Sequence, residues 1–190
     1  MNHFPPFIYT YLSSYHPSVW TNLKTPDASQ LIGAWTLGIF GITFSDQRPV
    51  VFPFGQQGTG LLMYSSCGLM SAILSCQDQA SFAVADLEKA YQSSVEDKAK
   101  AFDRYLSYGG RWEINWEISC PNELPSFQVI HHLQWSLTPD LEGTMNRRVG
   151  TLWRHPETNT LYLYLHYERT ARSGVKRTYH LVWQKNKEAD

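Results

Sequence analysis

The chain has 190 residues, of which 43% are hydrophobic and 17% charged, and its formal net charge is −1 at pH 7. This length suits one domain with a core, whereas two domains would each be small, and the composition excludes a disordered chain or a coiled coil. A phosphate-binding surface needs clustered cations, and the chain has no run of Lys or Arg. Nucleic acid is therefore not an expected partner.

Three cysteines, Cys67, Cys76 and Cys120, form no CxxC spacing. They indicate neither a disulfide framework nor a zinc site, and we expect free thiols in a reducing compartment. The first residues lack a basic start followed by an apolar stretch, and no apolar run reaches the roughly 18 residues that span a bilayer. We therefore expect a cytoplasmic protein without a membrane partner.

Residues 1–30 are rich in Pro, Ser and aromatic side chains but have no sustained period. They predict an irregular N-terminal arm that packs aromatic residues onto the domain formed by residues 31–190. An alternative use of the arm is as a surface for homo-oligomer formation. The side chains that favour packing over disorder are Phe4, Phe7, Ile8, Tyr9, Tyr11, Tyr15 and Trp20.

The first predicted strand covers residues 31–44, where β-branched and aromatic residues predominate. Two more are expected at residues 61–64 and 68–75, joined by a tight connection from Tyr64 to Gly68. All three fit a buried or half-buried sheet.

One helical region is predicted, from residue 82 to residue 107. Its second half opens with Ser94 as the N-cap, and Gly109 and Gly110 are expected to end it. Because the helix has one apolar stripe, we expect that stripe to lie against the domain. The stripe consists of Val95, Ala99, Phe102 and Leu106.

Residues 111–118 and 128–137 alternate between apolar and polar positions, as strands with one wet face do. The apolar faces consist of Trp112, Ile114, Trp116 and Ile118 in the first, and of Val129, His131, Leu133, Trp135 and Leu137 in the second. Further strands are expected at 144–154, 161–168 and 176–185. About eight strands with one helical insertion predict a mainly β fold, a single closed antiparallel β-barrel, which can hold one small ligand.

Several motifs occur in order along the chain: the Gly-x-Trp opening in LIGAW, then PFGQQGTGLLMYSSCGLMSA, YLSYGGRWEIN, VIHHLQWSLTPDLEGTMNRR and HLVWQK. Over roughly residues 31–185 this series resembles the small lipocalin-like domain family of bacteria and fungi. The resemblance implies a calycin-type barrel with the helix packed against it. It also implies a link to natural-product pathways, in which small cofactor-free barrels catalyse cyclisations, isomerisations or pericyclic reactions on polyketide or terpenoid intermediates.

His131, Arg148 and Tyr64 are the candidate catalytic residues. Patterning places His131 inside the barrel, where an imidazole exchanges protons near neutral pH, although a backbone carbonyl could also satisfy it; His132 falls on the opposite face. Arg148 matches the family's Arg and would bind a ligand oxygen, with Arg147 as the alternate if a bulge exchanges the two faces. Tyr64 would either hydrogen-bond the ligand or form a tyrosine corner.

The aromatic content of 14% suits a ligand cavity with flat walls. The predicted ligand-binding walls are Trp35, Met70, Trp112, Trp116, Leu133 and Trp135, with a structural role favoured for Trp35. No GxSxG, GxGxxG, HExxH or Walker motif occurs, so we expect no cofactor. We expect no metal either, although His155, His166 and His180 could meet in space.

The leading hypothesis is a cofactor-independent isomerase or cyclase, including a pericyclase such as a Diels–Alderase. It would act inside the barrel on one small apolar polyketide or terpenoid intermediate of secondary metabolism. The alternative is a non-catalytic lipocalin-like carrier of an apolar metabolite. Polar groups converging on one point would favour the enzyme, and a wholly apolar wall would favour the carrier.

Overall fold

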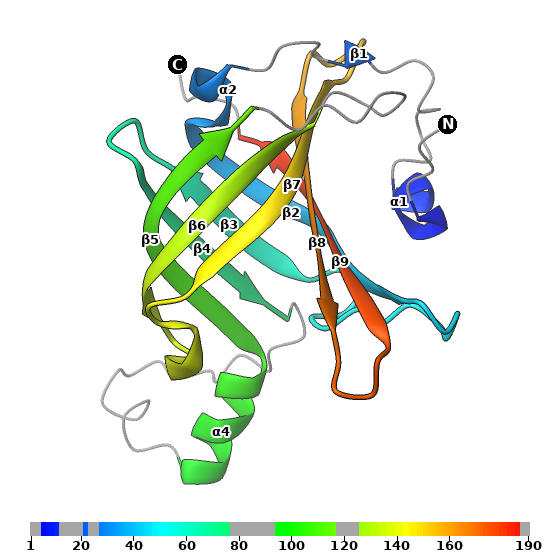
Figure 1. The fold of residues 1–190 in the computed structure, drawn as a ribbon, viewed down its shortest axis with the longest axis vertical. Helices are drawn as coiled ribbons and strands as arrows, with labels where there is room; N and C mark the ends of the chain where they lie inside the picture. Colours follow the sequence, from blue (N-terminus) through cyan, green and yellow to red (C-terminus); the bar gives the residue numbers. More distant parts are fainter. Residues whose placement is uncertain (1–4, 12–20, 23–26, 77–93, 117–125, 187–190) are drawn as a thin grey trace.

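The fold is a closed antiparallel barrel of eight strands, β2 to β9, in which β9 pairs back to β2 (Figure 1). The computed structural model describes residues 5–11, 21–22, 27–76, 94–116 and 126–186. The prediction of one closed barrel of about eight strands is confirmed. The strands are β2 (Gly33–Phe44), β3 (Thr59–Tyr64), β4 (Leu69–Ser75), β5 (Tyr105–Asn115), β6 (Phe127–Ser136), β7 (Met145–Arg154), β8 (Leu161–Thr170) and β9 (Lys176–Lys185).

One end of the barrel, here the α2 end, carries the short helix α2 (Ala28–Leu31) just before β2. Strand β2 therefore begins at Gly33, two residues later than predicted, because a capping box on Asp27 holds the preceding turn helical. The indole Nε1 of Trp35 donates to the carbonyl oxygen of Leu31 at 2.8 Å, and both side chains are fully buried. Trp35 thus holds α2 in place at this end of the barrel through one hydrogen bond and through packing.

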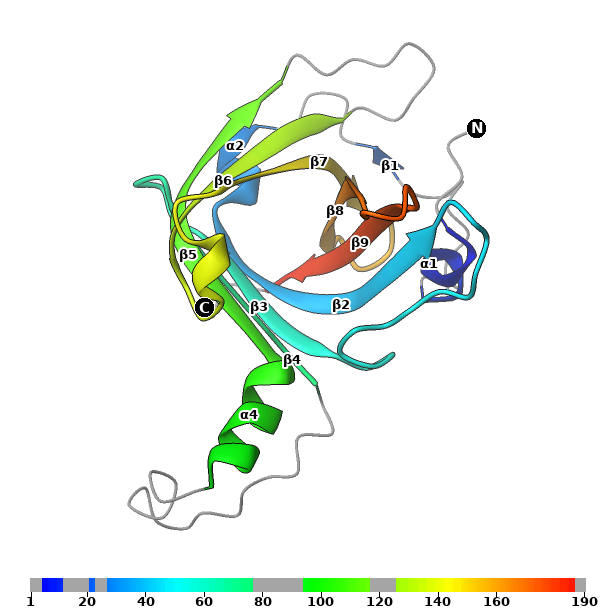
Figure 2. The same cartoon turned by 60° about the horizontal axis from the view of Figure 1, so that its bottom comes forward.

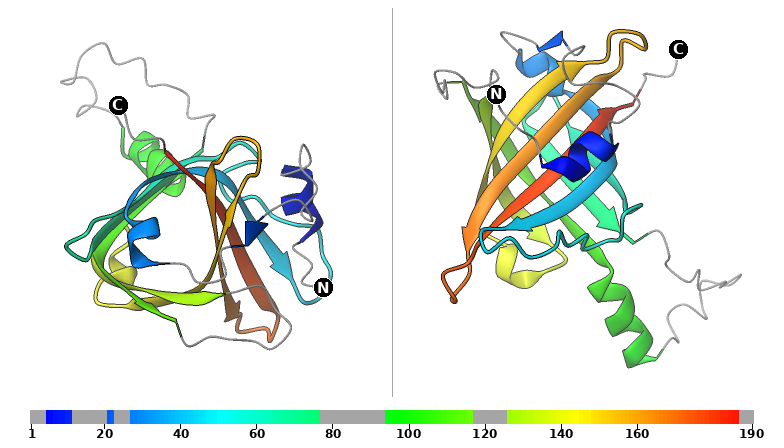
Figure 3. Two further views of the ribbon diagram at one scale, coloured as in Figure 1. Left: turned by 90° about the horizontal axis from the view of Figure 1, so that it is seen from above. Right: turned by 90° about the vertical axis from the view of Figure 1, so that its right-hand side faces the viewer.

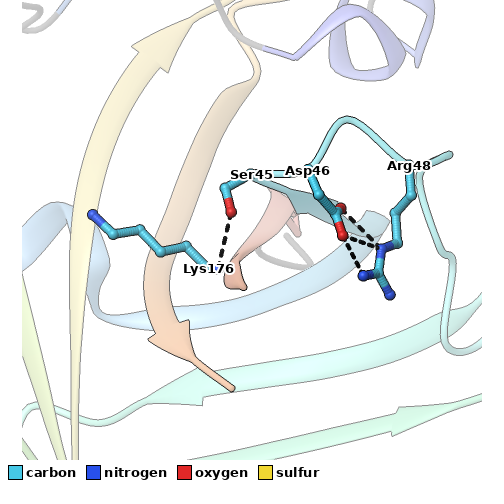
Figure 4. A network of polar contacts seen from close by, with 4 residues as sticks. All are labelled: Ser45, Asp46, Arg48 and Lys176. Atoms are coloured by element: carbon cyan, nitrogen blue, oxygen red, sulfur yellow. Dashed lines mark hydrogen bonds and ion pairs between the residues drawn. The ribbon is translucent and has the colours of Figure 1, made fainter. Parts of the chain in front are cut away.

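The opposite end, here the hairpin end, carries the β8–β9 hairpin and the 3₁₀ helix η2 (Pro139–Leu141) between β6 and β7 (Figure 2). One backbone hydrogen bond, from the Ser45 amide to the Lys176 carbonyl oxygen, continues the β2–β9 pairing there, and the Ser45 hydroxyl accepts from the Lys176 amide at 3.1 Å (Figure 4). In the following loop the Arg48 guanidinium forms an ion pair with Asp46. Charge on Arg48 is therefore already compensated within the loop.

Strand β6 explains why one inward-facing prediction is wrong. Inward residues alternate from Phe127 through His131 to Leu133, and all are buried as the pattern predicts. The pairing with β5 then passes from Leu133 opposite Gly110 to Trp135 opposite Gly109, so Gln134 is an extra residue. A bulge of this kind exchanges the two faces of the strand beyond it. Trp135 consequently points outward and is 61% exposed.

The helix α4 (Val95–Asp103) is shorter than predicted and projects from the hairpin end (Figures 1 and 3). Its N-cap is Ser94, as expected, but residues 82–93 lie outside the described residues. Tyr105 already pairs with Ser75 of β4, so sheet pairing overrides local helix preference well before Gly109. The predicted packing is wrong for the three stripe residues on α4, because Val95 is 78% exposed and none of the residues of α4 is buried. The fourth stripe residue, Leu106, belongs to β5 and does pack against the core.

The N-terminal residues that the structure describes lie on the outside of the barrel. Helix α1 (Pro6–Tyr11) packs against β2 with Ile8 fully buried, and the two-residue strand β1 (Thr21–Asn22) pairs with β7 (Figure 3). The Phe7 ring lies so close to Gly41 that a Cβ there would be 2.6 Å from it. Gly41 therefore provides the space in which Phe7 is seated.

Gly41→Ala is expected to lower the free energy of unfolding by about 1–2 kcal/mol, since the added methyl group displaces Phe7. Denaturant-induced unfolding of the single variants and the double variant measures this. In a Phe7→Ala background the Gly41 substitution should cost almost nothing, because the two residues share one contact. If Gly41→Ala lowers the free energy of unfolding equally in the wild type and in Phe7→Ala, the packing of Phe7 does not depend on the absence of a side chain at position 41.

Candidate functional site

The barrel interior contains a hydrogen-bonded pair of polar side chains from β3 and β6. The hydroxyl of Tyr64 lies 2.8 Å from Nε2 of His131, and both side chains are buried. Tyr64 is thus bonded to His131 rather than forming a tyrosine corner. Burial holds the pKa of His131 well below its ordinary value, and the nearby Arg148 acts in the same direction, so the imidazole is neutral at pH 7. Its Nδ1 has no hydrogen-bond partner among the described residues.

Arg148 enters the same interior from β7 and is only 5% exposed. Its Nη2 donates to the hydroxyl of Tyr108 at 2.8 Å, and its Cζ lies 4.8 Å from the centre of the Tyr167 ring. The Nε atom has no partner in the described part of the chain. Arg147, the alternate, is exposed and bonds Gln128 on the barrel surface, so the inward residue is Arg148.

These contacts define a polar cluster of five residues: Tyr64, Tyr108, His131, Arg148 and Tyr167. The rings of Tyr108 and His131, 6.2 Å apart, connect its two halves. Burial raises the pKa values of Tyr64 and Tyr167, so both remain protonated hydroxyl groups. The cluster therefore combines phenol donors, one fixed cation and one neutral imidazole. Such a set can hydrogen-bond a ligand oxygen and hold or move a proton.

Sequence reasoning identified three members of the cluster and missed two. Tyr108 was missed because it fell near the predicted end of the helix. Tyr167 could have been found, since it continues the inward alternation of Leu163 and Leu165 along β8. Tyr167 also stacks on Tyr179 of β9, with ring centres 4.5 Å apart.

The predicted wall residues divide into three groups. Trp112 lies against the Tyr64 ring at 4.8 Å, and Met70 and Leu133 are buried in the same core. Trp35 is at the α2 end. The placement of Trp135 in the interior is wrong, because Trp135 lies outside the barrel. Trp116 comes directly after β5, is 41% exposed, and packs against the fully buried ring of Phe127.

Large side chains of the protein itself fill the interior toward the α2 end. Trp35, Trp183 and Phe127 are almost inaccessible to solvent, whereas Ile42, Leu106 and Tyr179 toward the hairpin end are only partly buried. The described surface also has an apolar groove of about 810 Å³ on the outside of β3 to β6. Its protruding side chains are Met63, Leu69, Ile73, Tyr105, Trp135 and Leu137.

The three histidines considered as a metal site, His155, His166 and His180, do not come together. His166 and His180 stack at 6.5 Å on the outer face of β8 and β9, while Nδ1 of His155 accepts backbone amides of its own turn. The described residues contain no group of three His, Cys, Asp or Glu that could hold a metal ion. Cys67 and Cys76 are free, and Cys120 lies outside the described residues. No helix in the described ranges is long and apolar enough to cross a membrane.

A closed eight-stranded antiparallel barrel with an inward polar cluster defines the class of lipocalin-like barrels, a fold suited to binding a small molecule. The chain belongs to the lipocalin-like domain family, whose model matches residues 32–186. Comparisons with curated proteins and with solved structures found no match. The predicted family is thereby confirmed.

Proposed function

We propose that this protein is a cofactor-independent isomerase or cyclase that acts on one small organic molecule at the polar cluster. The observation that carries the proposal is the convergence of Tyr64, His131 and Arg148 from three different strands. Buried polar nitrogens are normally hydrogen-bonded. Nδ1 of His131 and Nε of Arg148 have no partner among the described residues, and a ligand oxygen would provide one.

The cluster suggests a division of labour. Arg148 and a tyrosine hydroxyl would stabilise negative charge as it develops on a substrate oxygen, and neutral His131 would accept or return a proton. The apolar wall formed by Trp112 and Met70 would hold a flexible intermediate near its reactive shape. A polyketide or terpenoid intermediate of secondary metabolism fits such a wall. A [4+2] cycloaddition would require only this orientation and hydrogen bonding.

A carrier without catalytic activity is the second candidate. It is favoured by the apolar character of most of the interior, where Leu62, Leu133, Leu163 and Leu165 surround the few polar groups. A carrier binds substrate and transition state equally, so it changes neither the rate nor the product distribution. An enzyme must change one of them.

The test is to incubate purified protein with candidate pathway intermediates and to compare products with the protein-free reaction. We expect acceleration or altered stereochemistry, and a loss of about 100-fold or more in His131→Ala and in Arg148→Ala. Trp135→Ala is the matched control, because Trp135 lies outside the barrel. If the rate and the stereochemistry stay unchanged for all candidate intermediates, the enzyme proposal is wrong and the carrier is the remaining explanation.

A further inference from the structure

The buried guanidinium of Arg148 has no acidic partner. The buried polar or charged side chains among the described residues are His131, Arg148, Thr151, His155 and His180, with no Asp or Glu. The ion pairs found there, Arg48 with Asp46 and His132 with Glu113, do not involve Arg148. Phenol oxygens and ring faces compensate a cation only partly, and an unpaired buried charge is costly. The interior therefore carries one positive charge that the described residues leave uncompensated.

More cations line the hairpin end on the way to Arg148. Arg169 of β8 and Arg177 of β9 are direct cross-strand partners, and they continue the inward alternation beyond the stacked pair Tyr167 and Tyr179. Like charges in such positions repel each other. The Cζ of Arg169 lies 5.6 Å from the Tyr167 ring, which also contacts Arg148. Along β8 and β9, the cations Arg169 and Arg177 at the end of the barrel thus lead inward to the buried cation Arg148.

A comparison with Arg48 supports a ligand as the missing partner of Arg148. At the same end of the barrel, the half-exposed Arg48 has Asp46 as an ion-pair partner, whereas the buried Arg148 has no acidic partner among the described residues (Figure 4). Arg169, Arg172, Lys176 and Arg177 have no ion pair with the described residues. A rim of this kind attracts anions and raises their association rate.

Resting on the proposed function, we infer that the ligand carries an anionic oxygen group such as a carboxylate, which binds the Arg148 guanidinium inside the barrel at the hairpin end. The free Nε of Arg148 and the hydroxyl of Tyr108 are positioned to share the anion. The apolar part of the ligand would lie against Trp112 and Leu133. The interior selects acids over the corresponding neutral molecules.

The test uses two fluorescent probes with one skeleton, the anion 1-anilinonaphthalene-8-sulfonate and its neutral parent N-phenyl-1-naphthylamine. Fluorescence titration of the full chain should show the anion binding about tenfold tighter or more. Arg148→Met should weaken binding of the anion by about 10- to 100-fold, as expected for lost charge-assisted hydrogen bonds, and binding of the neutral probe by less than about twofold. The thermal midpoint of Arg148→Met should stay unchanged or rise, because an apolar side chain replaces an unpaired buried charge.

Two controls separate the outcomes. Arg177→Gln should slow association of the anion at low ionic strength but not at high, and Trp135→Ser should leave both probes unaffected. If Arg148→Met weakens the binding of both probes equally, or if the wild type prefers the neutral probe, the inference of an anionic ligand is wrong. The proposed binding site inside the barrel would not be contradicted by either result. If Trp135→Ser alone abolishes binding, or if neither probe binds wild type, the interior site fails and the proposed function with it.

Discussion

Trp35→Ala is expected to lower the free energy of unfolding by about 3–5 kcal/mol, the range for truncating a large aromatic side chain in a packed core. Trp35 is fully buried and lies in one core cluster with Leu31 and Trp183 at the α2 end. Its removal leaves a cavity there and also frees the Leu31 carbonyl that its indole nitrogen satisfies. Urea-induced unfolding, followed by circular dichroism, measures the change.

Two matched substitutions separate the causes. Trp35→Phe keeps most of the buried area but loses the hydrogen bond, so it should cost less than Trp35→Ala. Trp135→Ala removes the same side chain from a site that is 61% exposed, and should cost about 0.5 kcal/mol or less. If Trp35→Ala lowers the free energy of unfolding by a similarly small amount, the core at the α2 end is not tightly packed around Trp35.

The alternation of residues along the strands carried enough information to predict the barrel. The pattern of β6 placed His131 and Leu133 inside correctly, because a two-residue period leaves few alternatives. The same pattern failed at Trp135, since the bulge at Gln134 depends on pairing with β5 and not on the sequence of β6 alone. Likewise, Tyr105 and Leu106 have helical neighbours in the sequence, but their pairing with β4 decides their conformation.

The site was predictable where one strand decides a residue's direction. The sequence predicted that His131 and Tyr64 line the same pocket, but it did not predict that they form a hydrogen bond. Their 2.8 Å contact depends on how the strands close into the barrel. Arg148 was preferred to Arg147, but a bulge in β7 would have exchanged the two. The register with β6, which places Arg148 opposite Val129, decides between them. The external groove was not foreseen, since its walls combine outward residues of the β3–β4 hairpin with outward residues of β5 and β6, which lie about 30 or more residues further along the chain.

Acidification from pH 6.5 to pH 4 is expected to lower stability, with His180 as one main cause. His180 lies beneath α1, with its Nδ1 2.6 Å from the Tyr164 hydroxyl and its Nε2 2.8 Å from Thr43 Oγ1. Burial, with His166 nearby, lowers the pKa of His180 to about 4. The unfolded chain binds a proton below about pH 6.5 and the folded chain does not, so stability falls through this window.

The shift corresponds to a loss on the order of 3 kcal/mol at His180. The lowered pKa of His131 adds to it in the same direction. His180→Gln should remove the His180 share, which unfolding free energies at pH 7.5 and pH 4.5 measure directly. Thr43→Val is the control, because it removes a hydrogen bond to His180 without removing the titrating group. It should leave most of the pH dependence in place, whereas full wild-type dependence in His180→Gln would exclude His180 as a cause.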